Sequence, residues 1–421
     1  MEDFSKNESM YNLLRTVKVV RKKTIELTKN LEIDDMVIQT ANYVSPIKWH
    51  LGHTSWFFEK FILAKFCKNY IFFNKDYDFI FNSYYETISH FNQRKNRGSL
   101  SRPTLEEVLR YRSYIDKNLD YLYEIYSNEL EELIKIALNH EQQHQELILM
   151  DVKNILYSNK NKPSYLKKKS EKKCRKVLKE KNQFILNEFR KMKYGYSGND
   201  FSFDNECPES KTEIYPFILS EFVTNKDWLS FIHDEGYKRP ELWLSDGWEF
   251  INKNKINKPM YWIDNNYLFS LNGVEKINMS SPVSHISFYE AKAFAKYKNT
   301  TLPSEFELEY TLKKSKKSGN FLENKVFKEH SYNSEKFIDK FYGNLWVWSS
   351  SPYLPYTNYT SYEKSLSEYN EKFMCNQYVL KGGSFATSID HIRASYRNFY
   401  YPYDRWQFVG LRLRKNYNLK G

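Results

Sequence analysis

The chain has 421 residues, which is too long for one hydrophobic core of ordinary size and predicts two domains. Aromatic residues make up 18% of it, yet no stretch approaches 18 consecutive apolar residues, which argues against a membrane-spanning helix. The formal charge of +12 would suit a nucleic-acid partner, but much of the excess lies in the lysine-rich stretch 160–181, which reads as a solvated linker. We therefore expect neither a nucleic-acid nor a membrane partner.

The cellular compartment is predicted from the first residues and from the cysteines. The start of the chain lacks the basic-then-apolar pattern of a signal peptide, so we expect a cytoplasmic location. The four cysteines lie far apart without CxxC spacing, which fits a reducing compartment and argues against a metal site built from thiols.

Four helices are predicted in the first 160 residues. The first covers about 11–31, and the second begins with Ser45 as N-cap and Pro46 in the first helical position and ends near residue 68. A capping box of Thr104 and Glu107 starts the third, and the fourth covers about 128–156. This pattern predicts a four-helix bundle, a fold that builds metal sites from side chains on facing helices. The connection 70–103 is long, and its many aromatic residues indicate an ordered loop.

The fourth predicted helix contains the most informative stretch, His140-Glu141-Gln142-Gln143-His144. Two histidines four residues apart lie on one helical face, here the apolar face, and both can reach a single metal ion. A second pair, His50 and His53, lies on the second predicted helix. Two helices that each direct histidines toward a shared interior predict a metal site.

The character of the sequence changes at about residue 183. Short aromatic-rich strands and turns follow, with one helix expected at 287–297 and another that begins near Pro303-Ser304-Glu305 and runs to about residue 314. We therefore predict an α+β protein of two domains, with a helical domain at 1–160, a basic linker at 161–182 and a second domain at 183–421.

The same five residues match the H-E-x-x-H pattern of zinc metalloproteases, in which the glutamate activates a zinc-bound water. Such enzymes usually take a third ligand from downstream, and here no histidine follows until His233. His53 is better placed, and Glu141 is then expected to be an ordinary residue on the helix surface. Three imidazoles suit either zinc or ferrous iron, so the pattern alone leaves the metal open.

Several separated segments resemble the ergothioneine-biosynthesis sulfoxide synthases (the EgtB family), in its cysteine-using branch. In the first half these are 45–59, Phe81-Asn82-Ser83-Tyr84-Tyr85-Glu86, Arg97-Gly98-Ser99-Leu100-Ser101-Arg102-Pro103-Thr104 and 140–149. In the second half they include Pro259-Met260-Tyr261-Trp262, Gly343-Asn344-Leu345-Trp346-Val347-Trp348, Gly382-Gly383-Ser384-Phe385, Arg397-Asn398-Phe399 and Gly410-Leu411-Arg412-Leu413. The resemblance covers nearly the whole chain.

The resemblance implies a DinB-like helical bundle fused to a formylglycine-generating-enzyme-like domain of C-type-lectin-like fold. It implies one Fe(2+) held by His53, His140 and His144, with His50 as a neighbour of the site or a helix-surface residue. Formylglycine-generating activity needs paired active-site cysteines, and Cys207 and Cys375 fall outside the motifs that would carry such a pair.

The reaction that the resemblance implies joins the thiol sulfur of cysteine to the imidazole carbon of hercynine, with O2 as oxidant, and gives a sulfoxide. Formation of the C–S bond and oxidation of the sulfur each remove two electrons, so O2 accepts all four and no external reductant is required. Binding the sulfur as thiolate overcomes the protonation of free cysteine at neutral pH.

The resemblance also suggests further site residues. At least one of Tyr84 and Tyr85 is expected to give a proton or hydrogen atom near the iron, and Gln143 is expected to contact hercynine. Arg97 and Arg102 are weaker candidates for binding substrate carboxylates. Phe399, Tyr400 and Tyr401 are candidates for an aromatic wall around the trimethylammonium group, and the adjacent Asn398 is a further candidate for substrate binding.

Four alternatives remain open. The branch that uses γ-glutamylcysteine has an acidic residue and an arginine in the segment after Arg397-Asn398, and here Tyr400 and Asp404 stand in those two places. Cysteine is therefore the preferred thiol donor and γ-glutamylcysteine the first alternative. The second is the ovothiol-pathway enzyme, 5-histidylcysteine sulfoxide synthase, which usually carries an added methyltransferase domain; we expect no such domain in this protein. The others come from different classes: the zinc metalloprotease, and a metal-free binding module. The oligomeric state is not predicted.

Overall fold

The computed structural model describes residues 2–167, 183–329 and 341–417. It divides into two compact units. The first comprises Met1–Lys167 together with two short segments from later in the sequence, Asn199–Phe201 and Tyr362–Tyr369; the second comprises the remainder. The domain limits given above stay a prediction, and residues 168–182 of the expected basic linker lie outside the described part of the chain.

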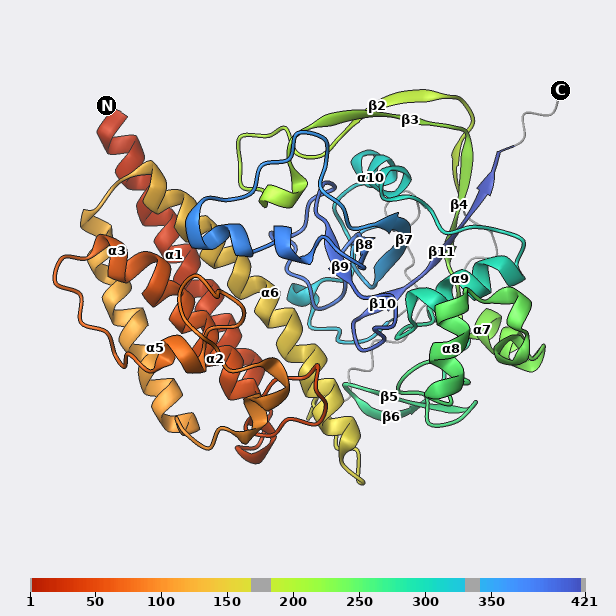
Figure 1. Ribbon diagram of the computed structural model, residues 1–421, viewed down its shortest axis with the longest axis horizontal. Coiled ribbons are helices and arrows are strands. Elements are labelled where there is room, and N and C mark those ends of the chain that lie inside the picture. Colours follow the sequence, from red (N-terminus) through yellow and green to blue (C-terminus); the bar gives the residue numbers. More distant parts are fainter. Residues whose placement is uncertain (1, 168–182, 330–340, 418–421) are drawn as a thin grey trace. The chain divides into compact units, whose positions relative to one another are not determined.

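The first unit is helical, as predicted, and Figure 1 shows its long helices packed beside one another. Helix α1 packs against α6, and α2 packs against both α5 and α6. The helices of this unit are α1 (Glu2–Thr28), α2 (Ile47–Phe58), α3 (Ala64–Phe66), α4 (Tyr77–Ile80), α5 (Leu105–Asn118) and α6 (Asn128–Ser158). A π-helical turn, Glu59–Leu63, joins α2 to α3.

Two helices of the first unit begin with side-chain caps, and one predicted cap is not formed. Thr104 forms the expected capping box with Glu107 at the start of α5, which confirms that prediction. Ser127 caps α6 by accepting a hydrogen bond from the amide of Leu130. The prediction of Ser45 as N-cap is wrong, because α2 begins one residue later than expected. Its N-cap is Pro46, which forms no side-chain capping hydrogen bond. Ser45 is held instead by tertiary contacts with residues far along the chain.

Helix α2 is the centre of the helical unit, since each of its twelve residues is buried. Two tryptophans on it fix the long connection to α5. Trp49 donates a hydrogen bond from its indole nitrogen to the carbonyl of Ile80 (2.9 Å), and Trp56 donates to Asp78 (2.8 Å). The connection is therefore ordered, as its aromatic content predicted, and it presents residues 81–85 to one side of α2.

The second unit combines small sheets with helices, which confirms the α+β prediction. One three-stranded sheet has the order β1-β4-β11 and a four-stranded sheet the order β10-β7-β8-β9; two hairpins, β2-β3 and β5-β6, complete the described strands. The bounds are β1 Gln183–Leu186, β2 Arg190–Tyr194, β3 Ser210–Ile214, β4 Phe217–Phe222, β5 Tyr267–Ser270, β6 Gly273–Lys276, β7 Trp346–Pro352, β8 Tyr378–Lys381, β9 Asn398–Tyr400, β10 Val409–Gly410 and β11 Arg412–Asn416.

Four helices of the second unit are α7 (Asn225–His233), α8 (Ser245–Lys253), α9 (Phe288–Tyr297) and α10 (Glu305–Lys314). Capping boxes begin α7, α9 and α10, so α9 and α10 lie where the sequence predicted helices. In the described part of the chain no helix combines the length and the apolar character needed to cross a membrane.

Candidate metal centre

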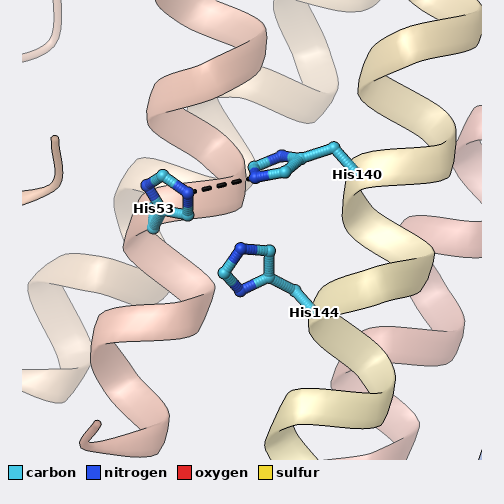
Figure 2. A group of neighbouring side chains, drawn as sticks. All are labelled: His53, His140 and His144. Atoms are coloured by element: carbon cyan, nitrogen blue, oxygen red, sulfur yellow. Dashed lines mark hydrogen bonds between the residues drawn. The ribbon is translucent and has the colours of Figure 1, made fainter. Parts of the chain in front are cut away.

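Three histidines from two helices converge inside the helical unit. His53 lies on α2, and His140 and His144 lie on α6; each offers a nitrogen, and these nitrogens lie within 4.8 Å of one another. Figure 2 shows the three rings turned toward a common point between the helices. All three side chains are buried. The sequence spacing explains the α6 pair, because residues four apart in a helix lie on the same face.

The Nε2 atoms of His53 and His140 face each other at 3.1 Å (Figure 2). A hydrogen bond between these two nitrogens would require one of them to carry a hydrogen. Two nitrogens that each lie about 2.1 Å from one metal ion at a right angle are themselves about 3 Å apart. The separation therefore suits two ligands of one ion.

His53 is oriented by its surroundings. Its Nδ1 donates to the backbone carbonyl of Phe81 (2.6 Å), which leaves Nε2 with a lone pair directed at the cluster. Gly52 permits this arrangement, since a Cβ there would lie 2.1 Å from the Phe81 ring. The Trp49 ring stacks on His53 with centroids 4.6 Å apart and fixes the plane of the imidazole.

His144 is held by side chains. Its Nδ1 lies 2.8 Å from Nδ1 of His50, and Nε2 of His50 lies 2.8 Å from a carboxylate oxygen of Asp151. The same oxygen accepts the amide hydrogen of Ser45 (2.9 Å). His50 is therefore a buried neighbour of the cluster, and the interpretation as a helix-surface residue is wrong because α2 is enclosed on all sides.

Burial keeps the histidines of the cluster neutral. It lowers the pKa of His140 to about 3, and with the neighbouring imidazoles it holds the pKa values of His53 and His144 well below their usual value. Neutral imidazole is the form that binds metal ions, so the site does not need to lose protons before binding near neutral pH.

The expectation that Glu141 is an ordinary surface residue is wrong. Its side chain is fully buried and forms ion pairs with Arg21 (3.1 Å) and with Arg112, and it accepts a hydrogen bond from Thr24 (2.7 Å). Burial alone would raise the pKa of Glu141, but the two guanidinium groups outweigh it and hold the pKa below its usual value. Both carboxylate oxygens are thus engaged by α1 and α5. A glutamate bound in this way is not placed to activate a metal-bound water.

Tyr84 and Tyr85 lie on the loop after α4, with ring centroids 4.6 Å apart. Asn82 holds this turn, because its side-chain oxygen accepts the amides of Tyr84 (3.2 Å) and Tyr85 (2.9 Å) and its nitrogen donates to the Tyr85 carbonyl. Tyr85 is fully buried and Tyr84 half-buried. The Phe57 ring contacts both His140 (4.3 Å between centroids) and Tyr85 (6.4 Å) and so links the tyrosine pair to the cluster.

Gln143 lies on α6 between the two histidines and is half-buried. The hydroxyl of Tyr369 donates to its side-chain oxygen at 2.6 Å, and the Tyr369 ring lies 5.9 Å from that of His140. The adjacent Glu368 accepts hydrogen bonds from the amides of Glu86 (3.1 Å) and Thr87 (3.0 Å), on the loop that carries the tyrosine pair. The segment Tyr362–Tyr369 therefore ties Gln143 and that loop together.

The two candidate arginines differ. Arg97 is buried, lies 3.3 Å from the centroid of the Trp49 ring and donates to the hydroxyl of Ser45 (2.9 Å). Among the described residues no carboxylate forms an ion pair with it, and burial lowers its pKa well below the usual value. Arg102 is exposed and donates to the carbonyl of Ser101. Of these two arginines, Arg97 is therefore the buried one, and it lies beside the cluster.

The remaining candidates, Asn398, Phe399 and Tyr400, form strand β9 of the second unit and are half-buried. Phe399 stacks between the rings of Tyr353 (4.1 Å) and Phe373 (5.9 Å). The side-chain oxygen of Asn398 accepts the amide of Phe399 (2.9 Å). The structure thus gives Phe399 a packing role in its own unit.

Sequence reasoning missed several residues that shape this site. Asp151 carried a signal, since it continues the helical stripe of His140 and His144, but its partner could not be read from spacing. Nothing in the sequence indicated Tyr369 or Glu368. Tyr369 lies 226 residues from Gln143 along the chain, and Glu368 lies 282 residues from Glu86.

The residues present fit a metal ion. Three neutral imidazole nitrogens on one side of an ion leave coordination positions open for small molecules, which is the arrangement of catalytic rather than structural sites. Nδ1 of His140 is buried without a hydrogen-bond partner in the described structure. His53, His140 and His144 would hold the ion, with buried aromatic rings excluding water around it.

The fold and this cluster define a two-unit α+β protein with a candidate metal centre in its helical unit. A family model described as "Sulfatase-modifying factor enzyme 1-like domain" matches residues 175–341 and 337–417, more than half of the chain. The chain belongs to this family.

Three curated relatives carry the name "Hercynine oxygenase". The relative from Mycolicibacterium thermoresistibile is 27% identical over 239 residues, covering 51% of this chain and 54% of the relative. Those from Mycobacterium tuberculosis and Mycolicibacterium smegmatis are 28% and 29% identical, covering 50% of this chain and 55% and 56% of theirs. They confirm the resemblance drawn from the sequence motifs. The chain spans about half the length of these curated relatives.

Two solved structures are similar to part of the chain. PvdO from Pseudomonas aeruginosa is 12% identical with a TM-score of 0.37, covering 56% of this chain and 94% of its own. Treponema denticola variable protein 1 is 14% identical with a TM-score of 0.38, covering 56% and 95%.

Proposed function

We propose that this protein is an iron(II)- and O2-dependent sulfoxide synthase that joins the sulfur of L-cysteine to the imidazole carbon of hercynine. The observation that carries the proposal is the buried cluster of His53, His140 and His144 in a chain whose relatives are named hercynine oxygenase. An oxygenase of this kind needs a redox-active metal, and zinc has no redox chemistry. Iron therefore fits both the three-histidine cluster and the oxygenase activity named for the relatives.

The iron, when bound, would supply a common centre for thiolate, imidazole and O2, which turns a meeting of three molecules into a local reaction. The overall reaction balances: the thiol and the imidazole C–H lose four electrons, one oxygen atom enters the sulfoxide and the other leaves as water. No external reductant is required.

The role of proton donor falls to the tyrosine pair. Burial raises the pKa of Tyr85 well above its usual value, so the phenol stays protonated at neutral pH and can give its proton at Oη. Asn82 fixes the turn that carries both tyrosines. Phe57, in contact with Tyr85 and His140, helps exclude water from the space between them.

The binding roles fall to Gln143 and Arg97. The bond from Tyr369 fixes the carboxamide of Gln143 beside the histidines, where it can contact the hercynine imidazole. Arg97 is a buried cation that lacks an ion-pair partner among the described residues, and a substrate carboxylate would supply one. Arg102, Asn398, Phe399 and Tyr400 are retained as weaker candidates for substrate contact.

The metalloprotease alternative is disfavoured by Glu141. Its carboxylate is committed to Arg21 on α1 and Arg112 on α5, so it is not placed to activate a water at the cluster.

The experiment that tests the proposal is metal analysis of anaerobically purified protein, followed by incubation with hercynine, cysteine and O2. We expect one iron per chain and a sulfoxide product identified by mass spectrometry. Zinc with peptidase activity, or a protein that binds no metal, would overturn the proposal.

The tyrosine pair gives a first prediction. Replacing both Tyr84 and Tyr85 by phenylalanine should lower the rate of sulfoxide formation by about 100-fold or more, because a positioned proton donor contributes about 100- to 10,000-fold. Product analysis by mass spectrometry also reveals any diversion to oxidation of the thiol alone. The exposed Tyr121, replaced by phenylalanine, is the control and should leave the rate unchanged. An unchanged product yield in the double variant would remove both tyrosines from the mechanism.

The thiol donor gives a second prediction. With hercynine present, cysteine should be used in preference to γ-glutamylcysteine by about tenfold or more in kcat/KM, because Tyr400 and Asp404 stand in place of the acidic residue and the arginine, in that order, that are expected for the longer donor. A competition assay with both thiols measures the ratio directly. Preference for γ-glutamylcysteine would replace the donor in the proposal while leaving the metal site intact.

A further inference from the structure

A chain of hydrogen bonds connects the candidate metal site to a buried carboxylate. It runs from Asp151 on α6 through His50 on α2 to His144 on α6, with both links 2.8 Å long. All three side chains are buried. These hydrogen bonds have no part in the proposed reaction. Their effect must therefore be on the position and protonation of the His144 ring.

The direction of the first link follows from Asp151. An ionised carboxylate can only accept hydrogen bonds. Its Oδ2 accepts the amide hydrogen of Ser45, and it also lies 2.8 Å from Nε2 of His50. Nε2 of His50 must therefore carry a hydrogen and donate it.

The second link follows from the first. In a neutral imidazole ring one nitrogen donates a hydrogen bond and the other accepts one. Because Nε2 donates, Nδ1 of His50 must accept, and the donor facing it is Nδ1 of His144. This places the hydrogen of His144 on Nδ1 and leaves its Nε2 with the lone pair. Figure 2 shows a ring nitrogen of His144 facing His53 and His140.

We propose that Asp151 and His50 are positioning residues that fix the tautomer and the ring orientation of His144, so that its Nε2 is presented to the metal ion. The inference rests on the proposed function, since it takes His144 as a ligand. In proteins, partners of this kind raise ligand basicity, and their loss typically costs about 10- to 100-fold in metal affinity.

The three histidines differ in how they are supported. His53 is held by the backbone carbonyl of Phe81, which no substitution at that position removes. Nδ1 of His140 has no hydrogen-bond partner in the described structure. Within the described residues, His144 is the ligand whose supporting hydrogen bond comes from a side chain outside the cluster, so a matched set of substitutions can test that support without touching a ligand.

Two substitutions of His50 separate hydrogen bonding from packing. A glutamine amide offers one donor and one acceptor about as far apart as the two imidazole nitrogens, so His50→Gln can restore both links. His50→Leu fills the space but can neither donate nor accept. We expect His50→Leu to raise the Kd for Co(II) and for Fe(II), measured anaerobically on the full chain, by about 10- to 100-fold. His50→Gln should stay close to the wild type.

Asp151 gives a second, independent pair. In Asp151→Asn, the backbone amide of Ser45 still needs an acceptor, so the asparagine side chain should place its oxygen where Oδ2 lies in the wild type. That oxygen can also accept from His50, and we expect most of the metal affinity to be retained. Asp151→Leu removes the acceptor and should lower the affinity about as much as His50→Leu. The exposed His90, replaced by leucine, is the control and should not change the Kd.

The outcomes separate the inference from the proposed function. If the wild type binds neither ion, the proposed function fails, and the inference fails with it. If the wild type binds and all four variants bind equally well, the inference alone is overturned. Thermal unfolding of the metal-free variants, followed by circular dichroism, identifies any that do not fold. Equal losses for His50→Gln and His50→Leu in folded proteins would also overturn the inference, because packing rather than hydrogen bonding would then support His144.

Discussion

Replacing His140 by alanine should abolish tight binding of iron(II), and replacing His144 should do the same. Each substitution removes one of three candidate ligands, so the loss should exceed the roughly 100-fold that removal of a supporting partner costs. The adjacent polar side chains on α6 are not free to replace the lost imidazole, since Gln143 is held by Tyr369 and Glu141 by two arginines. Iron content after anaerobic purification, together with the Kd for added Fe(II), measures the effect.

His90→Ala is the matched control for these ligand variants, because His90 is exposed and outside the cluster. It should bind iron as the wild type does. A His140→Ala protein that keeps its iron and turns over at the full rate would refute the ligand assignment, whatever the thiol donor proves to be.

Replacing Glu141 by alanine should destabilise the protein by about 3–5 kcal/mol, because it leaves two buried guanidinium groups without their shared carboxylate. Arg21 and Arg112 are each no more than 2% exposed, so water cannot take over the role of the lost partner. The free energy of the first unfolding transition in urea, measured with the metal-free chain, gives the value. In a metalloprotease the same residue would be needed for activity and dispensable for stability.

Glu106→Ala serves as the comparison. Glu106 pairs with Arg110 on the surface of α5, with its side chain 80% exposed, and such pairs contribute little. Its removal should leave the urea transition nearly unchanged. If Glu141→Ala shifted the transition no more than Glu106→Ala, the ion-pair network would not be a structural element of the bundle.

The sequence by itself determined those features that depend on neighbours along the chain. Four-residue spacing places His140 and His144 on one helical face regardless of the rest of the fold. The Thr104–Glu107 capping box marks the start of α5 for the same reason, since all its bonds lie within one turn. The change from helical periodicity to short aromatic strands likewise predicted two parts of different architecture. His53 was predicted as the third ligand from its position on a neighbouring helix and from the family resemblance, and the structure brings it within reach of the other two.

Only the tertiary structure decided which partners the remaining polar groups have. Glu141, one residue from a candidate ligand, looked like a surface residue because its partners on α1 and α5 lie 120 and 29 positions away. Ser45 looked like an N-cap but binds Asp151, 106 positions away, and Tyr369 reaches Gln143 across 226. Helical periodicity predicts the direction in which a side chain points. It does not predict which distant segment of the chain will pack against that side chain. The arrangement around the metal ligands therefore had to be read from the folded chain.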